Sequence, residues 1–183
     1  MIVYIEGPDG SGKTTLAHNI DKVCAQHGIS CLFGEPLIQT NPTKPNRVSE
    51  TELVYQLVKM LRNDEVVYIL DRGPISDCVY RAFDDYEPVM PINWLMDIFG
   101  QFRNKIVFIY ANNANAEYYM LQRGDDNPVA IAKHKKISYA YEMLKGYFSK
   151  TFGKIFCYDF EKTDVSEFSE RRFEEIERKL RRS

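Results

Sequence analysis

The chain of 183 residues lacks several features that would place it in a specialised class of protein. No two of its four cysteines form a C-x-x-C pair, which argues against the usual zinc and redox motifs, so we expect buried free thiols in a reducing compartment. No apolar run approaches the roughly 20 residues of a membrane-spanning helix. The first residues also lack the charged start and long apolar stretch of a signal peptide. These absences predict a cytoplasmic protein with no membrane partner.

Strong charge of one sign is also missing. The chain has 24 lysines and arginines against 26 aspartates and glutamates, a formal net charge of -2. Binding to long nucleic acid depends on a basic field, so we do not expect polymeric nucleic acid as a partner, although a local basic groove stays compatible with this charge. No repeat, low-complexity tract or linker divides the sequence. We therefore expect residues 1–183 to form a single domain.

Apolar runs of strand length alternate with helical patterns along the chain. The apolar runs predict strands at Ile2–Ile5, Ile29–Phe33, Val66–Leu70, Ile106–Tyr110 and Ile155–Tyr158. The periodic segments predict helices at Lys13–Gln26, Glu50–Leu61, Ser76–Phe83, Pro91–Phe102, Ala114–Gln122, Ile131–Phe148 and Ser166–Arg182. Short, continuously apolar strands that alternate with helices predict an α/β fold, with a central five-stranded parallel sheet and helices on both faces.

A glycine-rich segment follows the first predicted strand and opens the first predicted helix. Gly7–Thr14 matches G-x-x-x-x-G-K-[ST] in full, in the strand–loop–helix context that this P-loop motif requires. The backbone N–H groups of such a loop surround a phosphate, and the helix N-terminus adds partial positive charge. The motif predicts a P-loop NTPase fold with ATP and Mg²⁺ as cofactors. The expected cofactor-binding residues are Gly7, Asp9, Gly10, Ser11, Gly12, Lys13, Thr14 and Thr15.

Charged groups with distinct tasks stand in this loop and after the third strand. Lys13 would give a full positive charge to the β and γ phosphates, and Thr14 would offer its hydroxyl to Mg²⁺. Asp71 ends the strand Val66–Leu70, where a carboxylate beside the loop can hold the same metal. Arg72 follows it, and its planar fork suits phosphate oxygens. We therefore expect Thr14 and Asp71 at the metal, and Lys13, Asp71 and Arg72 among the catalytic residues.

Four segments resemble the thymidylate kinase and deoxynucleoside kinase group of P-loop kinases. Residues 5–15, which read IEGPDGSGKTT, look like the thymidylate kinase form E-G-x-[DE]-G-x-G-K-[ST]-T, and Glu35-Pro36 is similar to the E-P of both families. Asp71-Arg72, with Ser76 and Tyr80, keeps the register of D-R-Y-x-x-S-x-x-A-Y-Q. Arg123 and the helix of residues 137–141 resemble the lid arginine and the V-x-x-x-Y helix after it. The segments span nearly the whole chain in the family's order.

This resemblance implies roles for residues on the acceptor side of the reaction. Asp9 would face the hydroxyl of the acceptor sugar, Arg72 would hold the acceptor phosphate, and Tyr80 would line the nucleoside pocket. Glu35 would position the acceptor or act as a base. Arg123 would close over the transferring phosphoryl group. The resemblance also implies a lid at about residues 123–136, with Lys133, Lys135 and Lys136 as further basic groups, and a homodimer.

The departures from the family all fall on the acceptor side. Gly73 stands where thymidylate kinases have tyrosine, Arg81 where they have glutamine, and Gly34 where they have arginine. Asp9 and the Asp71-Arg72 pair nevertheless favour phosphoryl transfer to a small-molecule nucleotide, a deoxynucleoside monophosphate and in particular a deoxypyrimidine such as dTMP. Three alternatives stay open. They are a deoxynucleoside kinase with Glu35 as base, a kinase of a hydroxymethylated pyrimidine, free or in DNA, and a P-loop ATPase or switch without an acceptor.

Overall fold

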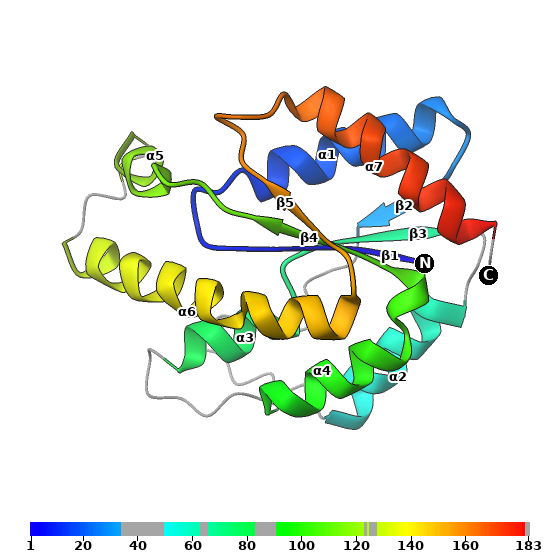
Figure 1. Cartoon of the computed structure of the whole chain (residues 1–183), viewed down its shortest axis with the longest axis horizontal. Coiled ribbons are helices and arrows are strands. Elements are labelled where there is room, and N and C mark those ends of the chain that lie inside the picture. The colour runs from blue at the N-terminus through cyan, green and yellow to red at the C-terminus, as the bar shows by residue number, and fades with distance from the viewer. Residues whose placement is uncertain (34–49, 63–65, 83–90, 123, 125–127, 182–183) are drawn as a thin grey trace.

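A central parallel sheet organises the molecule (Figure 1). The computed structural model describes residues 1–33, 50–62, 66–82, 91–122, 124 and 128–181. Within these residues the sheet has five strands in the order β2-β3-β1-β4-β5, and every neighbouring pair is parallel. The strands are β1 (Ile2–Glu6), β2 (Cys31–Phe33), β3 (Val67–Asp71), β4 (Ile106–Ala111) and β5 (Ile155–Tyr158). The predicted five-stranded parallel sheet is confirmed.

Helices cover both faces of the sheet (Figure 1). The described helices are α1 (Lys13–Gln26), α2 (Glu50–Arg62), α3 (Pro74–Arg81), α4 (Ile92–Gln101), α5 (Ala116–Gln122), α6 (Pro128–Phe152) and α7 (Val165–Leu180), with a 3₁₀ turn at Arg103–Lys105. Side chains of α1 and α7 share one buried cluster with the sheet, and those of α2, α3, α4 and α6 share the cluster on the other face. This is the layered architecture expected of strand–helix alternation.

Side chains along β1 alternate between these two layers. Val3 and Ile5 pack with α1 and α7, whereas Ile2 and Tyr4 pack with the opposite helices. Because both faces are covered, all five residues of β1 are buried, which is why the strand reads as an apolar run. Glu6 ends the strand on the same face as Ile2 and Tyr4. A carboxylate is thereby placed between the sheet and a helical layer.

Most differences from the predicted elements lie at their ends. The strand β2 begins at Cys31 rather than Ile29, because Gly28 has a φ of 74° and the Ile29 N–H still bonds to the carbonyl of Cys24, 2.9 Å away. Helix α6 begins at Pro128, three residues before the predicted start, since proline is well suited to the first helical position. It extends to Phe152 and ends before a glycine of positive φ.

The structure also shows how buried the cysteines are and whether a described helix could span a membrane. All four cysteines are free; Cys24 and Cys78 are buried, Cys31 is half-buried and Cys157 is exposed. The expectation of burial is wrong for Cys157, because β5 is an edge strand whose alternate residues face outward. Among the described residues, no helix has both the length and the apolar character needed to span a bilayer.

Candidate functional site

The loop between β1 and α1 has the backbone that its glycines permit. Gly7, Gly10 and Gly12 have φ values of 148°, 74° and 78°, which side-chain-bearing residues rarely adopt. A Cβ atom on Gly7 would lie 1.9 Å from the carbonyl oxygen of Ala111, and one on Gly10 would lie 2.6 Å from that of Ala116. The glycines are therefore needed for packing against β4 and α5 as well as for the close approach of a phosphate.

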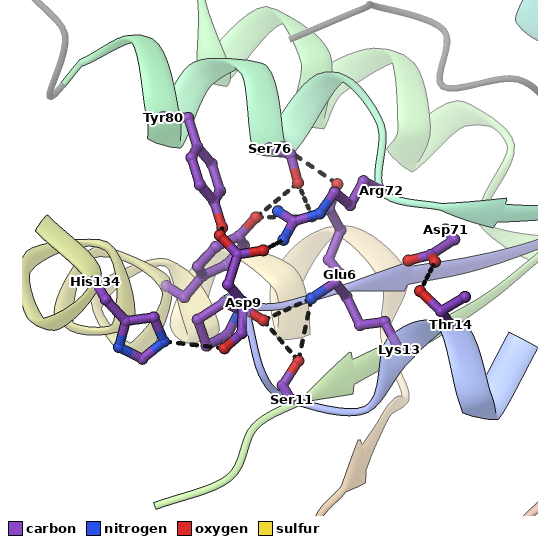
Figure 2. Close-up of polar contacts among 12 residues, drawn as sticks. Glu6, Asp9, Ser11, Lys13, Thr14, Asp71, Arg72, Ser76, Tyr80 and His134 are labelled. Atoms are coloured by element: carbon purple, nitrogen blue, oxygen red, sulfur yellow. Dashed lines mark hydrogen bonds and ion pairs between the residues drawn. The ribbon is translucent and has the colours of Figure 1, made fainter. Parts of the chain in front are cut away.

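Lys13 is folded back over this loop (Figure 2). Its ammonium group donates hydrogen bonds to the Pro8 carbonyl, 2.5 Å away, and to the Ser11 hydroxyl, 3.2 Å away. The residue is only 5% exposed, and this burial, together with the charge of Arg72, lowers the pKa of Lys13 to about 7. Because a nearby anion favours the protonated amine, phosphate binding in the loop and protonation of Lys13 are coupled.

Thr14 and Asp71 meet at the carboxyl ends of neighbouring strands. Parallel pairing sets Asp71 opposite Ile5, so the end of β3 lies beside the glycine-rich loop. The Thr14 hydroxyl donates to Asp71 Oδ2 at 2.6 Å, as Figure 2 shows. The other carboxylate oxygen, Asp71 Oδ1, is buried and has no hydrogen-bond partner among the described residues. A hydroxyl and a carboxylate oxygen are hard donors of the kind Mg²⁺ prefers, so these residues fit the predicted metal.

Asp9, Arg72 and Tyr80 form a charged cluster beside the loop (Figure 2). Arg72 makes an ion pair with Asp9, its guanidinium carbon lies 4.9 Å from the centre of the Tyr80 ring, and the Tyr80 hydroxyl donates to Asp9 Oδ2 at 3.0 Å. Burial alone would raise the pKa of Asp9, but the charges of Arg72 and Lys13 outweigh it and hold that pKa below its usual value. Burial raises the pKa of the Tyr80 phenol beyond its usual range. The cluster keeps a negative and a positive group side by side.

The backbone of Arg72 is strained. Its φ is 75°, and no other described non-glycine residue has a positive φ. The Arg72 N–H donates to the carbonyl of Ile5 at 3.0 Å, which ties this conformation to β1. A left-handed conformation at a non-glycine residue costs of order 1 kcal/mol, and strained residues of this kind cluster at functional sites. From this backbone conformation the Arg72 side chain makes its ion pair with Asp9.

Glu6 is a site residue to which the sequence analysis gave no role. The carboxylate is fully buried and accepts hydrogen bonds from the hydroxyls of Tyr4, Ser76 and Tyr141. Burial raises its pKa, and those hydrogen bonds and the charge of Arg72 act in the opposite direction. The signal was present in the sequence, because Ile2, Tyr4 and Glu6 share one face of a strand that is buried on both sides. A charged residue at such a position needs partners.

His134 is a second site residue to which the sequence analysis gave no role. It stands among the lysines at positions 133, 135 and 136, but its side chain is only 6% exposed and its Nε2 donates to the carbonyl of Asp9 at 3.0 Å (Figure 2). Lys135 and Lys136 are exposed, and Lys135 pairs with Glu117 at 3.3 Å. Helical spacing therefore directs the histidine toward the loop and these two lysines away from it.

A cavity of about 580 Å³ adjoins the loop. Its lining includes Gly12, Thr14 and Thr15 of the loop and the start of α1, together with Tyr119 of α5 and Phe160 after β5. Ligand pockets commonly measure roughly 300–1,000 Å³, so the space suits a molecule of nucleotide size. The sequence analysis did not identify Tyr119 and Phe160, because they come from α5 and the segment after β5 and form no motif.

The structure brings most of the predicted site residues together. The described set at the site is Gly7, Asp9, Gly10, Ser11, Gly12, Lys13, Thr14, Thr15, Asp71, Arg72 and Tyr80. Within it, Ser11 is buried and donates to the Pro8 carbonyl at 2.8 Å. Glu35 and Arg123, the remaining predicted residues, lie outside the described residues.

Comparison with known proteins gives a match at the level of fold. No protein-family model matches the chain, and no curated protein sequence does. The YorR protein of Bacillus subtilis, solved in complex with phosphorylated GDP, matches with a TM-score of 0.70 and 19% identity over 97% of this chain and 96% of its own. Deoxyadenosine kinase from M. mycoides, solved with dCMP and dCDP, matches with a TM-score of 0.55 and 18% identity over 97% and 98%. The chain has the α/β fold of P-loop nucleotide kinases.

Proposed function

We propose that this chain is a P-loop phosphotransferase that moves the terminal phosphoryl group of ATP to a nucleotide acceptor. The observation that carries the proposal is the cluster of Asp9, Arg72 and Tyr80 beside the loop that holds Lys13. A loop for the donor phosphates and a guanidinium for an acceptor phosphate, set side by side, are what transfer between two phosphates requires. The preferred acceptor in this proposal is a deoxynucleoside monophosphate, in particular a deoxypyrimidine such as dTMP.

The glycine-rich loop and four charged or hydroxyl side chains around it have separate tasks in the proposed transfer. The loop N–H groups and Lys13 neutralise charge on the moving phosphoryl group, and Arg72 aligns the acceptor phosphate with it. Thr14 and Asp71 would hold Mg²⁺, which would neutralise further phosphate charge when bound. A monophosphate acceptor is already an anion, so none of these residues has to remove a proton from it.

The remaining parts of the proposal rest on family resemblance. Arg123, within a lid of about residues 123–136, would close over the phosphoryl group and help exclude water. Glu35 would position the acceptor. We also propose a single-domain cytoplasmic protein that forms a homodimer, by analogy with the resembled family.

A second candidate function is a deoxynucleoside kinase, in which Glu35 would accept the proton of a 5′-hydroxyl. The likeness to deoxyadenosine kinase over nearly the full length of both chains favours it, as does the Ser76-Asp77 pair, which resembles the S-D of those kinases. The likeness to the YorR protein, solved with phosphorylated GDP, places guanine nucleotides among the acceptors to be tested.

The test is an acceptor panel with Mg-ATP. The panel contains deoxynucleosides, pyrimidine and purine monophosphates, GDP, and DNA with hydroxymethylated pyrimidines, and ADP formation is followed. We expect strong stimulation by a deoxypyrimidine monophosphate and no transfer by Lys13→Ala, the matched control that removes the loop cation. Stimulation by deoxynucleosides alone would transfer the assignment to the second candidate. ATP hydrolysis without acceptor stimulation, or transfer by Lys13→Ala, would overturn the proposal.

A further inference from the structure

Glu6 joins the glycine-rich loop to two helices. It is the last residue of β1 and directly precedes Gly7. The carboxylate accepts from Tyr4 at 2.7 Å, from the Ser76 hydroxyl at 2.6 Å and from Tyr141 at 2.9 Å. Each of these four residues is 0% exposed. Ser76 belongs to α3 and Tyr141 to α6, so one buried charge holds β1, α3 and α6 together.

The bonds between β1 and α3 cap the first turn of that helix. The residue before α3 is Gly73, which has no side chain to satisfy the exposed N–H groups of the first turn. The Ile75 N–H instead donates to the Tyr4 hydroxyl at 3.1 Å, and the Ser76 N–H donates to Glu6 Oε1 at 3.2 Å. A carboxylate at this position is also favoured by the helix dipole. Glu6 therefore fixes where α3 begins.

The hydrogen bond between Tyr141 and Glu6 fixes α6 relative to the loop. Tyr141 donates to Glu6 Oε2, and its hydroxyl also lies 2.8 Å from that of Ser76. About two turns earlier on α6, His134 bonds to the carbonyl of Asp9. The helix is thus attached on both sides of the loop's first residues, at Glu6 and at Asp9.

The network needs an acceptor at both carboxylate oxygens. Tyr4 donates to Oε1, and Ser76 and Tyr141 donate to Oε2. An amide in place of the carboxylate would turn an N–H₂ group toward one set of these donors. A buried donor without an acceptor costs roughly 1–3 kcal/mol, so an isosteric glutamine cannot reproduce the network.

We propose that Glu6 is a positioning residue for the acceptor side of the site. It does not touch substrate. By fixing the start of α3 it places Tyr80 within that helix and Arg72 just before its N-cap residue Gly73, and by fixing α6 it holds the helix that bonds to Asp9. The kinetic readout rests on the proposed function, whereas the structural readout below does not need it.

The first experiment compares Glu6→Gln with Glu142→Gln. Glu142 is the matched control on the same helix as Tyr141. Its described partners are Tyr110 at 2.9 Å, Asn112 at 2.8 Å and Lys145 at 3.8 Å, and none of them belongs to α3 or to the loop. We expect Glu6→Gln to raise the acceptor KM roughly tenfold to hundredfold, the worth of a hydrogen bond to a buried charge. We expect the ATP KM to change less than about twofold, and both KM values to stay near wild type in Glu142→Gln.

The second measurement is amide hydrogen exchange by NMR without substrates. We expect the Ser76 amide to lose protection in Glu6→Gln and to keep it in Glu142→Gln. If Glu6→Gln does not fold, Ser76→Ala and Tyr141→Phe take its place. Each of them removes one hydroxyl donor and should raise the acceptor KM by a smaller factor. Glu6→Asp, which keeps the charge, should recover part of the effect.

Two results would overturn the positioning role. One is a folded Glu6→Gln variant in which the acceptor KM is unchanged or the Ser76 amide keeps its wild-type protection. The other is an equal rise of both KM values, which is the sign of a general loss of structure. If the wild-type protein transfers phosphate to no acceptor, the proposed function fails, and the exchange measurement still decides whether Glu6 holds the start of α3.

Discussion

Gly73 and Tyr4 share a small space at the start of α3. A Cβ atom on Gly73 would lie 2.8 Å from the Tyr4 hydroxyl oxygen and 3.0 Å from the nearest ring carbon. The Tyr4 side chain cannot move aside easily, because it is fully buried and its hydroxyl bonds to Ile75 and Glu6. The glycine that departs from the D-R-Y pattern is therefore explained by the tyrosine on β1.

This contact gives a prediction at the residue scale. Gly73→Ala should lower the free energy of unfolding by about 1–3 kcal/mol, the usual cost of overpacking. Tyr4→Phe removes the closest atom, so the loss caused by Gly73→Ala should be smaller in the Tyr4→Phe background. Urea unfolding of both single variants and the double variant measures this coupling. Equal losses in the two backgrounds would contradict the explanation.

At the scale of elements, local patterns predicted what local forces determine. The bounds of α1 and β5 agree with prediction, because a glycine-rich loop, helical periodicity and an apolar run each act within a few residues. Asp71 and Arg72 could be placed because parallel strands end at one edge. Glu6, His134 and the cavity wall at Tyr119 could not be assigned, because their roles depend on contacts between elements far apart in the sequence.

Helix α3 also contains a charge pair that includes Arg81, one of the departures from the family. The Asp77 side chain is 1% exposed and pairs with Arg81, which is 19% exposed. Restoring the family's glutamine by Arg81→Gln would take the guanidinium away from a buried carboxylate. We expect the free energy of unfolding to fall by about 1–3 kcal/mol, measured by urea unfolding.

The control for this prediction has the same helical spacing on the surface. Arg171 pairs with Glu167 on α7, with side chains that are 64% and 56% exposed. Because solvent screens such a pair, Arg171→Gln should cost no more than about 0.5 kcal/mol. Asp77→Asn combined with Arg81→Gln should recover part of the loss. Similar costs at the two sites would show that burial of Asp77 does not strengthen its pair.

At the scale of the whole molecule, Lys13 links folding to pH. Its pKa is about 7 in the folded protein against 10.5 for an ordinary lysine, so between these values the unfolded chain binds more protons. Stability should therefore rise with pH through this window, by at most about 1.4 kcal/mol per pH unit. Burial raises the pKa of the Cys78 thiol to about 12, and such groups reverse the slope at higher pH. The useful range is therefore pH 7 to about 8.5, below the ordinary thiol pKa.

Urea unfolding of wild type and Lys13→Met across this range isolates the lysine, because other titrating groups are common to both proteins. The unfolding free energy of wild type should increase relative to that of Lys13→Met as pH rises. Saturating Mg-ADP should abolish that change, because phosphate in the loop keeps Lys13 protonated. The same coupling predicts uptake of about one proton when Mg-ADP binds at pH 8.5. Calorimetry in two buffers of different ionisation enthalpy measures this uptake, and equal binding heats in the two buffers would show that Lys13 stays charged in the free protein.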